Sequence, residues 1–99
     1  MNVKYSRSFQ KSVNKLSGKM LTSVMNTIIE VKNARKIGDI TDCIKITGYD
    51  NVYRIRIGIY RAFFTLHIYV EGDFVFFEYL TPRGQAYDKN IQSRLKKKQ

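Results

Sequence analysis

The sequence contains one cysteine, one proline and no tryptophan. The lone cysteine, Cys43, cannot form an internal disulfide, and no cysteine–histidine cluster has the spacing of a structural zinc site. One proline leaves no proline-rich linker, no apolar run reaches the roughly 18 residues of a membrane-spanning helix, and the N-terminus lacks the apolar segment of a signal peptide. We therefore expect a single domain over residues 1–99 in a reducing, cytoplasmic setting, without a membrane partner.

Acidic residues are also scarce, because eight Asp and Glu stand against 18 Lys and Arg, for a formal net charge of +10. So large an excess in a small chain predicts a polyanionic partner. Nucleic acid is the leading candidate, since each neutralised phosphate releases counterions. A membrane surface is disfavoured because no basic amphipathic helix with an aromatic rim is evident, and an acidic protein partner stays an open alternative.

The types of residue that build metal and nucleotide sites are sparse. One histidine, one cysteine and eight dispersed acids offer no metal-ligand spacing, which disfavours a two-metal nuclease. The glycines are too scattered for a phosphate-binding loop or a dinucleotide fingerprint. Any catalysis is therefore expected to need no metal and no cofactor.

The hydrophobic pattern changes its period along the chain. Alternation over residues 3–5 predicts a short opening strand, and Ser6 or Ser8 can cap a helix that Gly18 ends. From residue 19 to about 35, apolar residues recur at spacings of three and four, which predicts a second helix antiparallel to the first.

Beyond the helices the period falls to two, which is typical of strands. Gly58 and residues 71–73 are predicted turns, and apolar residues beyond Gly84 recur every four positions, as in a helix. Strands are predicted over residues 43–47, 52–57, 60–70 and 74–80. The fold class is α+β, with two N-terminal helices packed on a mainly antiparallel sheet of four to five strands, followed by a C-terminal helix.

Arginines gather on one face of the predicted sheet. Alternation in the strand over residues 52–57 puts Arg54 and Arg56 on the face away from the core. Pairing around Gly58 brings Arg61 of the next strand close to both, while residues 62, 64, 66 and 68 line the core. Just past the last strand, Arg83 and Tyr87 can reach the same patch. We predict an electropositive concavity that contains aromatic side chains and lacks an evident carboxylate.

Each of these residues also has an ordinary structural interpretation. Arginines on an open sheet face usually only solvate it. Tyr87 continues an apolar stripe that is more often core than a proton donor, and an isolated histidine such as His67 is more often a spectator than a base. Cys43 is interpreted as a small buried hydrophobe.

Residues 45–61 read KITGYDNVYRIRIGIYR. This segment closely resembles the centre of RelE/ParE-superfamily toxins from bacterial toxin–antitoxin modules, and the YRIRIGxYR core is fairly specific. The resemblance continues to Arg83 and Tyr87 and covers essentially the whole chain in the family's order of elements. The chain departs from many relatives at Ile59, where they have an acid, and at Pro82, where they have a histidine.

The resemblance implies a RelE-like ribonuclease that enters the ribosomal A site and cuts mRNA by metal-free attack of the RNA 2′-OH on the adjacent phosphate. Its partners are then mRNA, the ribosome and a separately encoded antitoxin. The family's five basic and tyrosine positions are matched by Arg54, Arg56, Arg61, Arg83 and Tyr87, and all but Arg54 are expected to be catalytic. The expected RNA-binding residues are Arg54, Lys45 and Phe63, and either Phe63 or Tyr53 is the ring on which an unpaired base stacks. A gyrase-poisoning toxin without nuclease activity and a noncatalytic RNA-binding subunit are the alternatives.

Overall fold

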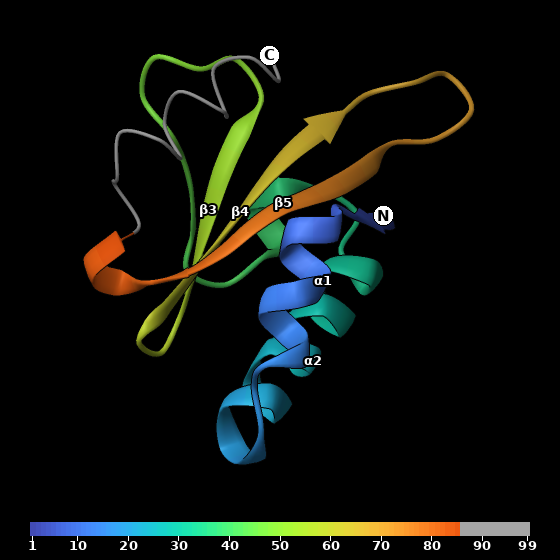
Figure 1. Cartoon of the computed structure of the whole chain (residues 1–99). Coiled ribbons are helices and arrows are strands. Elements are labelled where there is room, and N and C mark those ends of the chain that lie inside the picture. Colours follow the sequence, from blue (N-terminus) through green and yellow to red (C-terminus); the bar gives the residue numbers. More distant parts are fainter. Residues whose placement is uncertain (86–99) are drawn as a thin grey trace.

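The computed structural model describes residues 1–85, so the predicted C-terminal helix and Tyr87 lie outside the described residues. Within this part, helices pack on one face of a five-stranded sheet (Figure 1). The strands are β1 (Asn2–Tyr5), β2 (Cys43–Lys45), β3 (Val52–Ile57), β4 (Tyr60–His67) and β5 (Phe74–Pro82), and the helices are α1 (Arg7–Asn14) and α2 (Gly18–Asn33). Short 3-10 helices cover Ile37–Asp39 and Arg83–Gln85. The predicted α+β class is confirmed.

The sheet has the order β1-β5-β4-β3-β2. Strand β1 runs parallel to β5, with Asn2 opposite Phe74 and Tyr5 opposite Phe77. The pairs β2–β3, β3–β4 and β4–β5 are all antiparallel. The expectation of a mainly antiparallel sheet therefore holds, and the opening strand supplies its one parallel pairing.

Ser6 begins helix α1 and ties it to the sheet. Its hydroxyl oxygen accepts a hydrogen bond from the backbone N–H of Phe9 at 2.9 Å and donates to the carbonyl of Glu78 in β5 at 2.6 Å. Because Ser6 satisfies an otherwise unpaired N–H of the first turn, the helix starts here and not at Ser8. Gly18 does not end α1 but opens α2, with a positive φ of 59°.

The sheet has a buried cluster on each face. Phe9, Val24 and Ile28 from the helices pack with Ile55, Phe64 and Phe77 from the sheet in the larger one. On the opposite face Val52, Phe63 and Tyr79 form a smaller cluster that Ile46 and Tyr49 cover from the β2–β3 loop. The predicted alternation in β3 and β4 is correct, but the second face is not simply open to water.

The β4–β5 hairpin differs from its prediction. Strand β4 ends at His67 and not near residue 70, and Ile68, predicted to lie in the core, is 74% exposed. The reason is visible in Figure 1, where the β4–β5 connection projects beyond the rest of the sheet, so no helix lies over it. A register shift between Phe63 and Phe64 further interrupts the pairing of the two strands.

Candidate functional site

The turn between β3 and β4 brings three of the predicted arginines to one end of the sheet. Arg56 lies directly opposite Arg61 in the strand register. The backbone N–H of Arg83 donates to the carbonyl of Ile59, inside the turn, at 2.7 Å. Gly58 allows the reversal because its φ is +58°, a value that side chains with a Cβ rarely adopt. Three separate segments therefore contribute an arginine to one turn.

The guanidinium of Arg61 holds this turn together. Its Nη1 donates to the carbonyl oxygens of Gly58 and Tyr60, both at 2.9 Å, and the residue is only 7% exposed. A charged donor shared by two carbonyls forms strong hydrogen bonds. The positive charge of Arg61 is therefore fixed in position before any ligand arrives.

Arg56 and Arg83 present their charges to solvent. Arg56 Nη2 lies 3.4 Å from Oδ1 of Asp42, and the two side chains are 57% and 48% exposed. An ion pair this exposed contributes little to stability, so a phosphate can take the place of Asp42. Arg83, in the short helix after β5, is exposed as well.

Arg54 and Lys45 lie away from the turn. Arg54 is half-buried in β3 opposite Phe63. Lys45 is exposed at the end of β2 and pairs with Tyr53, three residues from Arg56 and therefore about 10 Å along the strand. Neither joins the three arginines at the turn, although Arg54 shares their sheet face.

Phe63 is fully buried between Val52 and Tyr79. No ring face is therefore exposed for a base to stack on, contrary to the role expected from the sequence. Alternation correctly assigned the residue to the arginine-bearing face, but it could not show that Ile46 and Tyr49 cover that part of the face.

The prediction that the arginine patch has no evident carboxylate is wrong, because Asp42 lies 3.4 Å from Arg56. A second acid, the buried Glu78, lies farther along the sheet. Glu78 is 4% exposed, and its Oε2 accepts a hydrogen bond from the hydroxyl of Thr65 at 3.2 Å. The same hydroxyl lies 2.9 Å from Nε2 of His67. Thr65 therefore links the side chains of Glu78 and His67 through one hydroxyl group. The sequence feature that could have predicted a buried acid here is the position of Glu78 within the apolar run of β5.

Burial raises the pKa of the Cys43 thiol from 9.0 to about 11. The nearby Glu30 raises it further, while Arg54 opposes the shift. A thiol with so high a pKa is protonated at neutral pH and is a poor nucleophile. Cys43 packs against the core as a small hydrophobe, as expected, but it is half-buried and not buried.

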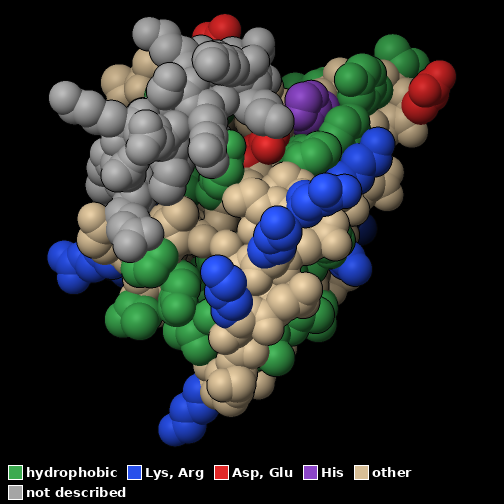
Figure 2. Space-filling model, viewed as in Figure 1, with side chains coloured by type: hydrophobic (Ala, Val, Ile, Leu, Met, Phe, Trp, Pro, Cys, Tyr) green, Lys and Arg blue, Asp and Glu red, His purple; other side chains and the backbone are tan. Residues whose placement is uncertain are grey.

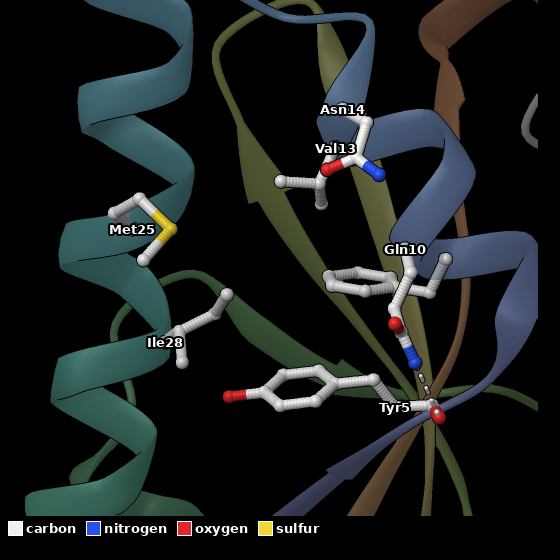
Figure 3. Close-up of a pocket in the computed structure, with 7 residues that line it drawn as sticks. Tyr5, Gln10, Val13, Asn14, Met25 and Ile28 are labelled. Atoms are coloured by element: carbon white, nitrogen blue, oxygen red, sulfur yellow. Dashed lines mark hydrogen bonds between the residues drawn. The ribbon is translucent and has the colours of Figure 1, made fainter.

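A groove between α1 and α2 encloses about 290 Å³. Figure 3 shows Val13 of α1 and Met25 and Ile28 of α2 lining it, with Gln10 donating to the backbone oxygen of Tyr5 at 3.4 Å. The groove is mostly apolar and contains none of the arginines, whereas a second pocket of about 290 Å³ is lined by Arg56 and Asp42 together with residues of α2.

The described residues contain neither a metal-binding cluster nor a membrane-spanning helix. Among residues 1–85 no three His, Cys, Asp or Glu side chains lie close enough to hold a metal ion. No helix in the same range is long and apolar enough to cross a membrane.

The chain is similar to one curated protein and to several solved structures. No family model matches the chain. The toxin RelE3 of Methanocaldococcus jannaschii is 34% identical over 89 residues, which cover 89% of this chain and 97% of that protein. The RelB–RelE antitoxin–toxin complex from Methanococcus jannaschii contains a chain with a TM-score of 0.68 and 26% identity, over 86% of this chain and 95% of that one. A chain of the RelE–RelB complex from Pyrococcus horikoshii OT3, at 22% identity and a TM-score of 0.65, covers 86% of this chain and 97% of its own length and shares the fold.

Proposed function

Since this chain belongs to the RelE toxin family, we propose that it is the toxin of a toxin–antitoxin pair and that it cleaves mRNA on the ribosome. The solved relative from Methanococcus jannaschii is a toxin bound to its antitoxin, which supports an antitoxin partner here. The net charge of +10 favours an antitoxin with an acidic toxin-binding segment, and it also favours the ribosome and mRNA as targets.

The observation that carries the proposal is the pairing of Arg56 with Arg61 beside Arg83. Like charges placed directly opposite in an antiparallel pair destabilise a sheet. A fold that retains such an arrangement, and fixes one of the charges with two carbonyls, is suited to bind a group of opposite charge. A phosphate of RNA is that group.

The reaction proposed is attack of the RNA 2′-OH on the adjacent phosphate, which yields a 2′,3′-cyclic phosphate and a free 5′-OH. Negative charge grows on the phosphorane during the step, and preorganised guanidinium groups stabilise it. Arg56 and Arg83 are exposed and contact the phosphate, while the fixed charge of Arg61 adds to the field at the turn. Tyr87 carries a proton to or from the reacting oxygens, and Arg54 and Lys45 bind the flanking RNA backbone.

The decisive experiment translates a defined mRNA with purified ribosomes and the protein, and maps new 5′ ends by primer extension. We expect cuts in phase with codons, and we expect Arg83→Ala to lower the cleavage rate about a hundredfold or more, the usual effect of removing a group that stabilises charge in the transition state. Arg35→Ala is the matched control, because Arg35 is also an exposed arginine but lies just after α2. Intact mRNA together with gyrase-dependent DNA breaks would instead assign the protein to the gyrase-poisoning class.

A second variant addresses the proton carrier. Tyr87→Phe removes only the hydroxyl and is expected to slow cleavage about a hundredfold while leaving ribosome binding unchanged, as for a general acid or base. An unchanged cleavage rate at saturating ribosome would remove Tyr87 from the catalytic set.

A further inference from the structure

Three aromatic rings form a stack at the projecting end of the β4–β5 hairpin. His67 and Phe74 face each other in the strand register, with ring centroids 4.6 Å apart and planes within 10°. Tyr69 also stacks on Phe74, with centroids 5.6 Å apart and planes within 13°. We call His67, Tyr69 and Phe74 the ring stack.

The ring stack lies at the surface and not in the core. Tyr69 is 56% exposed, and its neighbours Ile68 and Val70 are 74% and 107% exposed. Figure 2 shows the histidine beside hydrophobic side chains of this hairpin, next to a row of Lys and Arg. Because Tyr69 stacks on Phe74 and is still more than half exposed, one side of its ring faces solvent.

A cation is already in place over the stack. Lys4 of β1, itself exposed, holds its Nζ 4.3 Å from the centroid of the Phe74 ring. Beyond it, Arg7, Lys11 and Lys15 recur every four residues and are all exposed, so they share one side of α1. Like charges at this spacing repel one another, although Lys11 in the last turn favours the helix dipole. The row gives this side of α1 a positive surface that suits a polyanion.

The side chain of His67 is held in position by Thr65 and, through it, by Glu78. Its Nε2 lies 2.9 Å from the hydroxyl of Thr65, which in turn donates to the buried side chain of Glu78. A ring held in this way does not have to be ordered when a ligand stacks against the surface, and preorganisation of this kind favours binding.

From these observations we propose that the ring stack is a second RNA subsite, where an unpaired base stacks on Tyr69 and Lys4 contacts a neighbouring phosphate. Stacking on an aromatic ring beside a cation is a common way to hold single-stranded RNA. The choice of RNA as ligand rests on the proposed function.

The second subsite lies on the same sheet face as the arginines but at the other end of β4. His67 is six residues from Arg61, or about 20 Å along the strand. A base on the ring stack therefore belongs to a nucleotide some way from the one that is cut. Phe63, the ring expected from the sequence to bind a base, lies between the two and is buried.

The test uses single-stranded RNA oligonucleotides that carry the fluorescent base 2-aminopurine at one position each, with the full chain in an Arg83→Ala background. We expect fluorescence quenching at a preferred position, and Tyr69→Leu to abolish it and weaken binding about 5- to 100-fold, the range for loss of one stacked base. Val70→Ala is the matched control, since Val70 is fully exposed in the same loop and has no ring. Lys4→Gln is expected to reduce the salt dependence of binding by about one phosphate contact.

Equal affinity and equal quenching for Tyr69→Leu and Val70→Ala would overturn the subsite, and a lowered melting temperature of Tyr69→Leu would then show that the stack only stabilises the hairpin. Loss of antitoxin binding with unchanged RNA binding would overturn it as well. The two proposals fail separately: quenching without ribosomal mRNA cleavage would refute the nuclease and leave the subsite, whereas cleavage without quenching would refute the subsite alone.

Discussion

Replacing Arg61 with alanine is expected to loosen the β3–β4 turn as well as to remove a charge. The Nη1 of Arg61 donates to two turn carbonyls at 2.9 Å from a position that is 7% exposed. A hydrogen bond from a charged donor contributes about 1.5–3 kcal/mol, and because one nitrogen makes both contacts we expect a loss of about 2 kcal/mol. Each kcal/mol lowers the melting temperature of a domain this size by about 4–8 °C. The expected fall is therefore about 8–16 °C.

The assay is thermal unfolding followed by circular dichroism at one protein concentration. Arg83→Ala serves as the control, because its exposed side chain predicts a change within about 0.5 kcal/mol. If Arg61→Ala has the same melting temperature as the wild-type protein, the two carbonyl contacts do not stabilise the turn. The inference that they fix the charge of Arg61 would then be wrong. If the expected fall is found, cleavage by Arg61→Ala has to be measured well below its transition, so that lost structure is not counted as lost catalysis.

Three further predictions concern the fold and its cysteine. Ser6→Ala is expected to lower stability by about 1 kcal/mol in urea titrations, while Ser8→Ala, two residues later and without the capping contact, has a much smaller effect. Phe63→Ala is expected to cost about 3–5 kcal/mol, measured in the same way, because its ring is fully buried. Since the pKa of Cys43 is raised from 9.0 to about 11, alkylation by iodoacetamide near pH 8 is expected to be about a hundredfold slower in the folded protein than in urea; equal rates would contradict the burial.

The sequence predicted the central hairpin well. Strict alternation set the bounds of β3, and Gly58 marked the reversal that places Arg56 opposite Arg61. These features are local, because a two-residue hydrophobic period and a turn with positive φ are both determined by residues that are close together in the sequence. The same alternation assigned Arg54, Arg61 and Phe63 to one face.

Features that depend on distant segments were not predictable in this way. Alternation shows which face Phe63 lies on but not that the β2–β3 loop covers it, and it extended β4 past His67 because Ile68 and Val70 continue the apolar pattern without any partner element to bury them. The direction of the Arg61 side chain depends on carbonyls that become available only when the turn forms. Tertiary contacts decide such cases over local pattern.

The parallel pairing of β1 with β5 has a consequence for synthesis of the protein. Strand β1 cannot pair until β5 has been synthesised, because Asn2 pairs with Phe74, some seventy residues later in the chain. Helix α1 depends on the same strand, since Ser6 donates to the carbonyl of Glu78 in β5. Contacts so distant along the chain form slowly, and until they form they leave apolar surface uncovered. A nascent chain that stops before β5 lacks the strand that joins β1 to β4, so a truncated product is expected to be harmless to the cell that makes it, and prone to aggregate.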